Sequence, residues 1–302
     1  MAFANIIPEI WSARFQMRLD KELIWGGLVN RNYEGEIAQA GDTVKIPKLT
    51  KSVAVKDYSR NTDIDAAEVA TFTTVDFAIA QQKYFNIYVD DIDAVQAKPN
   101  GMDVFLNEAV KTMAETVDAY VAGKATVDAA ATAGNTLAVG ATGSKFTQAT
   151  GETRTQAATA LLSGMADLRT KMFTDKVLRL GVTTPSLVIS QEVFTLLEKY
   201  ISVDSDPRYG VVSEGMLRSG FAGNLLGYNI FVSTDVSKAA DKHILPVLYP
   251  EAVTFAGQVT ELVPYRPQAR FGDAVKMLYV FDAMLTDSRY LYHLDFFFDA
   301  DG

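Results

Sequence analysis

The segment from residue 30 to residue 62 has the pattern of β-strands but little apolar surface with which to bury them. Val44 and Ile46 alternate with polar neighbours, and Val53 and Val55 repeat the same period of two. This period is typical of strands with one apolar face. Most of the remaining positions are polar, and many are charged. Because a two-stranded ribbon this polar is marginal in water on its own, we expect it to lie on a surface outside itself.

Two further strand-like segments follow, at residues 68–80 and 83–93, and both are rich in Val, Ile, Phe, Tyr and Thr. A polar stretch from residue 56 to residue 68 separates them from the first pair. We therefore expect residues 41–89 to form one long excursion, in which the chain leaves a sheet and later returns to it. A connection of this length usually has a function.

Helical patterns precede and follow this excursion. Before it, Trp11, Phe15, Leu19 and Leu23 recur at every fourth position and form one stripe. This stripe fits a helix packed on its own domain, an arm docked on a neighbouring subunit, or a membrane-surface helix, although nearby acidic residues argue against the last. After the excursion, residues 103–123 predict a helix about 20 residues long. Its apolar face comprises Met102, Leu106, Ala109, Met113, Val117 and Tyr120.

The second half of the chain alternates between helical and strand patterns. An Ala-, Thr- and Gly-rich stretch at 125–160 predicts a domain boundary. Beyond it we expect a helix near 158–172, a strand from Ser186, a helix from Gln191 and a strand from Tyr228. Residues 244–285 are again strand-rich. The chain thus predicts an α+β fold.

Composition limits the function classes. The 302 residues suffice for one large domain or two ordinary ones, and no apolar run approaches the ~20 residues of a membrane span. The N-terminus lacks a secretory signal pattern, so we expect the protein to stay in the cytoplasm where it is made. The absence of cysteine excludes disulfides and cysteine zinc sites. With 28 basic and 37 acidic residues the net charge is −9, which argues against direct DNA binding but not against enclosing DNA.

The chain shows no pattern of a known active site. His243 and His293 are isolated, and no phosphate-binding, dinucleotide-binding or serine-hydrolase motif occurs. Asp90, Asp91 and Asp93 are the best metal candidate, but without companion ligands a turn is the simpler interpretation. We therefore expect no catalytic residue, cofactor or metal site.

Several longer motifs resemble those of tailed-phage major capsid proteins. They are "NIIPEIWSARFQMRLDKELIWGGLVNRNYEGEIAQAGDTVKIPKL", then "YFNIYVDDID", then "LYPEAVTFAGQVTELVPYRPQARFGDAVKMLYVFDA". The similarity spans nearly the whole chain in the same order. It implies the Hong Kong 97-type capsid fold, with an N-terminal arm, an extended β-hairpin E-loop, a peripheral domain with a long spine helix, and an axial domain.

The resemblance also implies a division of the chain. Its parts are the arm (1–33), the E-loop region (34–80), the first part of the peripheral domain with the spine helix (81–132), the axial domain (133–250) and the returning peripheral strands with the C-terminus (251–302). The ribbon would then lie on the next subunit. The expected subunit-interface residues are Trp11, Phe15, Leu19, Leu23, Val53, Val55 and Tyr58.

The implied function is that of a coat protein. Hexamers and pentamers of this chain would form an icosahedral shell that encloses double-stranded DNA without sequence-specific binding and without a membrane. Expected partners are a separate scaffolding protein and a portal, with a decoration protein as an optional third. Assembly would take place in the host cytoplasm, and the location would be the virion. An encapsulin-like cellular compartment and an enzyme with an unrecognised carboxylate site are the alternatives.

Overall fold

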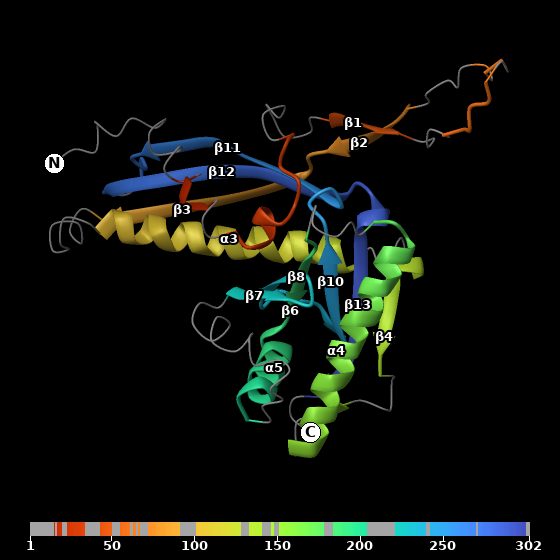
Figure 1. Cartoon of the computed structure of the whole chain (residues 1–302). Helices are drawn as coiled ribbons and strands as arrows, with labels where there is room; N and C mark the ends of the chain where they lie inside the picture. Colours follow the sequence, from red (N-terminus) through yellow and green to blue (C-terminus); the bar gives the residue numbers. More distant parts are fainter. Residues whose placement is uncertain are drawn as a thin grey trace.

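The structure is a computed structural model with a mixed α+β fold, and the residues that it describes form three sheets (Figure 1). The residues that it describes are 15, 17–19, 23–33, 43–49, 55–60, 63–64, 66, 72–90, 101–127, 133–140, 146–147, 151–177, 184–203, 221–239, 242–269 and 271–299.

The first sheet is the two-stranded ribbon, in which β1 (Thr43–Leu49) pairs antiparallel with β2 (Phe72–Ala78). Val44 and Ile46 of β1 are buried and Lys45 between them is exposed, so the predicted alternation is confirmed for this strand. The pairing strand is β2 and not the segment around Val55. Val55 lies outside any strand and is 97% exposed, because its segment has no neighbouring strand among the described residues on which to bury a side chain.

The second sheet has three antiparallel strands in the order β11-β12-β3. They are β3 (Gln81–Asp90), β11 (Val253–Tyr265) and β12 (Gly272–Leu285). The long helix α3 (Gly101–Val127) runs along one face of this sheet (Figure 1). The predicted helix is confirmed. Its buried stripe is Leu106, Val110, Met113, Val117 and Val121.

Two residues that were predicted for the buried face of α3 lie instead at its border. Ala109 and Tyr120 are half-buried, and Val110 and Val121 occupy the centre of the stripe. Leu106, Met113 and Val117 belong to both the predicted and the observed stripe, so the covered face is displaced only slightly, toward the residues that directly follow Ala109 and Tyr120. The helix also begins at Gly101, so Asp103 lies inside its first turn.

The third sheet has eight strands in the order β4-β13-β10-β6-β8-β7, with β5 on β13 and β9 on β10. The strands are β4 (Thr136–Val139), β5 (Phe146–Thr147), β6 (Ser186–Ile189), β7 (Phe221–Leu225), β8 (Tyr228–Val232), β9 (Lys238–Ala239), β10 (Lys242–Leu248) and β13 (Leu291–Asp299).

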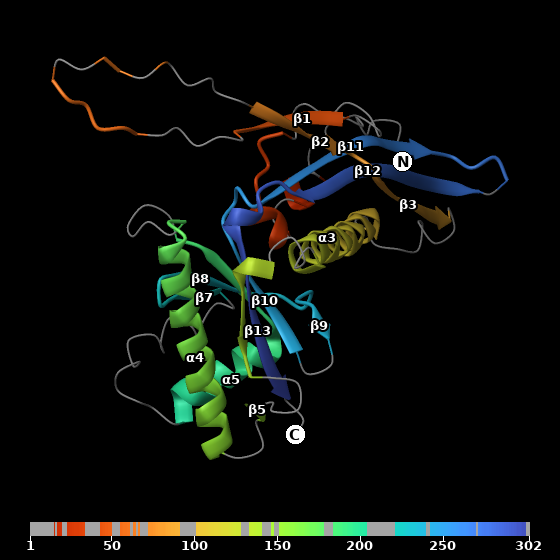
Figure 2. The ribbon, with the colours of Figure 1, turned by 90° about the vertical axis from the view of Figure 1, so that its right-hand side faces the viewer.

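The helices beside this sheet are α4 (Gly151–Thr174) and α5 (Gln191–Val203). Figure 2 shows α4 and α5 below the ribbon and the three-stranded sheet. The apolar face expected for the helix near 158–172 is buried throughout: Ala158, Leu161, Leu162, Met165, Leu168 and Met172.

The C-terminal strand β13 lies in the eight-stranded sheet and not with β11 and β12, where the division at 251–302 had placed it. It pairs with β10 on one edge and with β4 on the other. All side chains from Leu291 to Phe296 are buried. Because the strand is buried, its backbone N–H and C=O groups need hydrogen-bond partners on both edges, and β4 and β10 provide them.

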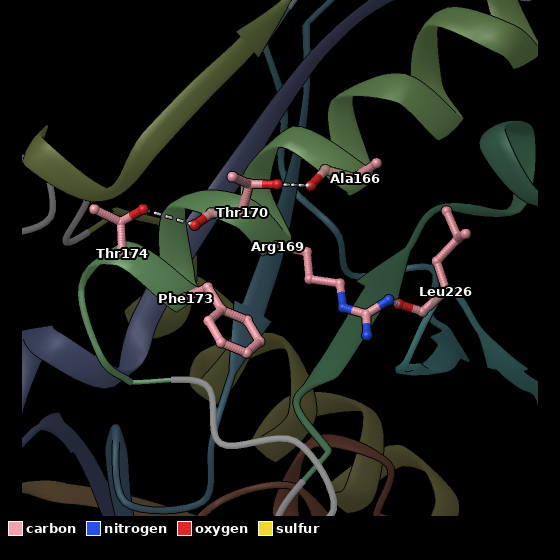
Figure 3. A pocket seen from close by; sticks show the side chains of 6 residues that line it. All are labelled: Ala166, Arg169, Thr170, Phe173, Thr174 and Leu226. Carbon is pink, nitrogen blue, oxygen red and sulfur yellow. Dashed lines mark hydrogen bonds between the residues drawn. The ribbon is translucent and has the colours of Figure 1, made fainter.

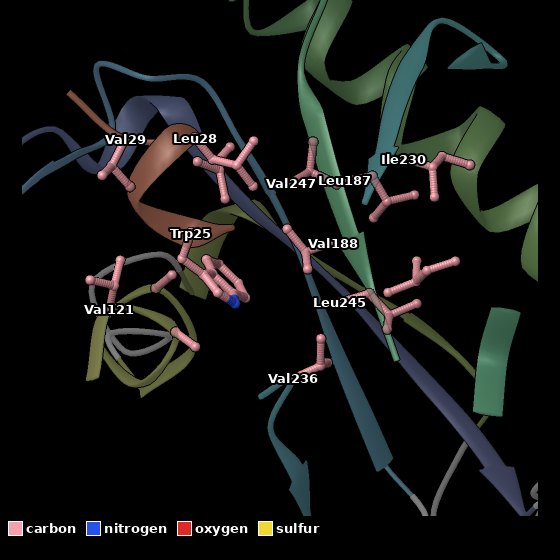
Figure 4. Packing of buried hydrophobic residues seen from close by; sticks show 14 of the residues in the cluster. Trp25, Leu28, Val29, Val121, Leu187, Val188, Ile230, Val236, Leu245 and Val247 are labelled. Carbon is pink, nitrogen blue, oxygen red and sulfur yellow. The ribbon is translucent and has the colours of Figure 1, made fainter. Parts of the chain in front are cut away.

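Short 3-10 turns join these parts: η2 (Trp25–Gly27), η5 (Ala133–Asn135) and η6 (Ser288–Tyr290). Trp25 in η2 is fully buried and lies between α3 and the eight-stranded sheet, near Val121, Val188 and Leu245 (Figure 4). Both larger sheets contribute to this one apolar cluster. The segment before the ribbon is therefore part of the subunit core.

Gly257 in β11 allows Tyr279 of the adjacent strand to lie flat across the sheet. A Cβ atom at Gly257 would collide with the Tyr279 hydroxyl and would lie 2.8 Å from its Cζ. Because Tyr279 is fully buried, its ring has no room to move. Gly257→Ala should lower the free energy of unfolding by about 1–3 kcal/mol in a urea titration. Gly134→Ala is the control, since nothing lies within 4 Å of its added Cβ, and an equal loss in both variants would contradict this account.

Candidate subunit-contact surfaces

The tip of the ribbon carries large apolar side chains in solvent. Val55, Tyr58 and Ile64 are 97%, 72% and 80% exposed, and Figures 1 and 2 show their segment projecting away from the sheets. Charged residues, including Lys56 and Arg60, lie beside them. Exposed apolar side chains gathered on a projecting segment are typical of a binding surface. Val53 lies outside the described residues.

The base of the ribbon, in contrast, packs on its own subunit. Val44, Ile46, Phe77 and Ile79 form a small apolar cluster with Ala256 and Val280 of the three-stranded sheet. The sequence had suggested that the ribbon lies on a neighbour. Among the described residues of the ribbon, the apolar side chains at the base are buried on their own subunit, whereas those at the tip are exposed.

Lys48 fixes the end of β1 to the connection between β12 and β13. Its Nζ donates to the carbonyl of Thr286 at 3.3 Å and lies 3.5 Å from the Asp287 carboxylate, which Arg289 also contacts at 2.6 Å. Burial alone would raise the pKa of Asp287, but the hydrogen bonds of Arg289 and the charge of Lys48 outweigh it and lower the pKa. The carboxylate therefore stays ionised, and the ion pair orients the ribbon.

Asp282 of β12 fixes the other side of the ribbon. Its carboxylate accepts hydrogen bonds from the Ala80 backbone N–H at 2.9 Å and from the Tyr120 hydroxyl at 2.8 Å. Burial and the neighbouring Asp282 raise the pKa of Tyr120 to about 12, so its hydroxyl remains a donor at neutral pH. One buried carboxylate thus connects β12, α3 and the turn after β2.

The N-terminal stripe is covered by the subunit's own core. Phe15, Leu19 and Leu23 are buried in the same cluster as α3, whereas Met17 and Arg18 between them are exposed. The stripe with a four-residue period is confirmed for these three positions. Because these three side chains are buried within the subunit, they cannot contact a neighbouring subunit. An interface at this segment would have to use other residues. Trp11 lies outside the described residues.

Three further large side chains are exposed on other elements. Tyr84 of β3 is 77% exposed, Phe271 directly before β12 is 82% exposed, and Phe173 of α4 is 47% exposed. Phe173 lines an open pocket together with Arg169, whose Nη1 donates to the Leu226 carbonyl at 3.1 Å (Figure 3). Sequence reasoning did not single out these positions, because isolated aromatic residues within regular elements usually belong to the core.

The residues considered for chemistry take structural positions. The Nε2 of His293 donates to the Ala125 carbonyl at 2.7 Å, and burial lowers the pKa of His293. The Nδ1 of His243 lies 3.0 Å from the Ser190 hydroxyl and its Nε2 lies 3.3 Å from Glu192. Asp90 ends β3, while residues 91 and 93 fall outside the described part. Within that part, no three His, Asp or Glu side chains are grouped as metal ligands would be.

None of the described helices is long and apolar enough to span a membrane.

Comparison with known proteins identifies the family. A family described as phage capsid protein matches residues 41–294. Solved structures share the fold: a chain of Mycobacterium phage Che8 is 24% identical with a TM-score of 0.63 and 90% of each chain covered. The capsid of Cyanophage P-SCSP1u is 13% identical with a TM-score of 0.64, covering 90% of this chain and 86% of that chain. No curated protein matches.

The chain therefore belongs to the phage capsid protein family, and its mixed α+β fold is that of phage capsid subunits. It is a major capsid protein of a tailed-phage shell. As such it is a structural protein and a virion component, and copies of it form the shell.

Proposed function

We propose that this subunit follows the Hong Kong 97 plan, with β1 and β2 as the base of the E-loop and α3 as the spine helix. The three-stranded sheet with α3 then corresponds to the peripheral domain. The eight-stranded sheet with α4 and α5 corresponds to the axial domain, and β13 joins it. The element order and the long helix beside the three-stranded sheet support this assignment.

The main contact between neighbouring subunits is made by the ribbon tip. The observation that carries this proposal is the contrast within one ribbon: the base is buried on its own sheet, while Val55, Tyr58 and Ile64 at the tip are exposed. A partner that covers three such side chains would gain roughly 1.5–3 kcal/mol from each. Because a shell contains many copies of one chain, the partner is a second copy.

The closed shell consists of hexamers and pentamers around DNA, with no enzymatic activity of its own. A separate scaffolding protein and a portal, and in some shells a decoration protein, assist its assembly in the host cytoplasm. The net charge of −9 fits a wall that encloses DNA without binding it.

Analysis of the content of purified particles tests this function. We expect double-stranded DNA of one length class inside shells from infected cells. Shells that contain an enzyme cargo and no genome would favour the encapsulin-like alternative and contradict the proposal.

A further inference from the structure

The subunit has two bodies, the three-stranded sheet with α3 and the eight-stranded sheet with α4 and α5. Residues 24–30, here called the strap, are attached to the first body through a buried carboxylate of α3. Asp118 is 5% exposed and accepts hydrogen bonds from the backbone N–H groups of Ile24 at 2.7 Å, Trp25 at 3.1 Å and Gly26 at 3.4 Å. The strap therefore begins at a fixed point of the long helix.

The strap ends on the same body, at the outer edge of β11. The backbone N–H of Asn30 donates to the Val253 carbonyl at 2.9 Å, and the Asn30 carbonyl accepts from the Phe255 N–H at 2.9 Å. Both ends of the strap are thus hydrogen-bonded to the body that contains α3. The strap follows any movement of that body.

One side chain of the strap reaches the second body. The Nε1 of Trp25 donates to the hydroxyl of Ser233 at 3.1 Å, and the Trp25 ring is fully buried beside Val121 and Val236 (Figure 4). Ser233 directly follows β8 of the eight-stranded sheet, and its hydroxyl oxygen also accepts from the Asp235 backbone N–H at 3.1 Å. Trp25 therefore links the two bodies, with its backbone on α3 and its indole on Ser233.

The chain itself joins the two bodies at a different place. The connections from β10 to β11 and from β12 to β13 meet there, where the Thr286 N–H donates to the Ala252 carbonyl at 2.9 Å. The strand β6 lies between β10 and β8, so Ser233 is at least two strand spacings, about 10 Å, from this joint. A second attachment away from a joint prevents the rotation that the joint alone would allow.

We propose that the hydrogen bond between Trp25 and Ser233 sets the angle between the two bodies and, through this angle, the curvature of the shell. The proposal rests on the proposed function, in which copies of one chain form both pentamers and hexamers. A directional bond within each copy narrows the range of angles at which neighbouring copies are joined. Without it, the shared apolar cluster still holds the bodies together but allows a wider range, so shells of a single diameter become less frequent.

Particle diameters measured by electron microscopy test the strap. Ser233→Ala and Trp25→Phe each remove the bond, one from each side. The ratio of shells with an aberrant diameter to regular shells should rise about fivefold in Ser233→Ala, as expected for the loss of one neutral hydrogen bond. The double variant should resemble Trp25→Phe alone, because both substitutions remove the same bond.

Tyr228→Phe is the matched control. The buried Tyr228 hydroxyl donates to the Met165 carbonyl of α4 at 3.0 Å, so this variant also loses one buried hydrogen bond, but within a single body. Its shells should keep the wild-type distribution of diameters. Denaturant unfolding establishes that each variant is folded and that Ser233→Ala and Tyr228→Phe lose similar stability.

Two results would overturn the proposal: wild-type diameters in Ser233→Ala, or an equal change in Tyr228→Phe. If Trp25→Phe does not fold, Ser233→Ala alone decides. Failure of the wild-type chain to form any shell is a different result, because it would contradict the proposed function itself.

Discussion

Subunits that carry Val55→Asp and Tyr58→Asp should fold normally and fail to form shells. Both side chains are exposed in the subunit, so the substitutions should change the free energy of unfolding by less than about 0.5 kcal/mol. At the subunit contact they would remove two apolar side chains and bury two charges, a loss of several kcal/mol per contact. Circular dichroism measures the folding, and electron microscopy counts the particles.

Val55→Ile with Tyr58→Phe is the matched control, because it keeps the apolar surface of the tip. This pair should assemble at close to the wild-type yield. Normal shells from the Asp pair would show that the tip makes no essential contact. Loss of the folded subunit would instead place the tip within the subunit core.

Replacement of Trp25 by Ala should destabilise the subunit by about 3–5 kcal/mol, the usual cost of removing a fully buried aromatic side chain. Trp25 fills the space where η2, α3 and the eight-stranded sheet meet, so a cavity there weakens three parts together. Denaturant unfolding measures the loss. Trp25→Phe keeps most of the volume and loses the bond to Ser233, and it should cost about 1–2 kcal/mol. A cost below about 1 kcal/mol for Trp25→Ala would contradict the central position of this residue.

Elements whose burial follows a local period were predictable from the sequence. The alternation of Val44 and Ile46 gave the strand β1, and the stripe from Ala158 to Met172 gave the helix α4, because in both cases one face meets the core. The helix α3 was also predictable. The exact set of buried residues on α3 was not predictable. The way the sheet packs on the helix decides which of two neighbouring rows of residues lies at the centre of the buried face.

Long-range features were not predictable in the same way. The sequence of β13 is a continuous apolar run, which would fit either of the larger sheets. Only the strand pairing in the structure shows that β13 lies between β4 and β10. Asp282 resembles any other acidic residue of a strand until Tyr120 and Ala80 are placed beside it.

The special position of Asp118 could have been noticed in the sequence. It interrupts a line of buried small residues on α3 that includes Ala114 and Ala122, and a carboxylate in such a line needs donors. Those donors are backbone N–H groups about 90 residues earlier in the chain, which no local pattern reveals.

For the ribbon contact, the most direct measurement is cryo-electron microscopy of native particles at side-chain resolution, with sedimentation to establish their mass. We expect a megadalton closed shell in which Val55, Tyr58 and Ile64 of each copy are buried on an adjacent copy, while Val44 and Ile46 stay on their own sheet. Native material that sediments only as a monomer or dimer, or a shell in which the three tip side chains remain in solvent, would contradict the account.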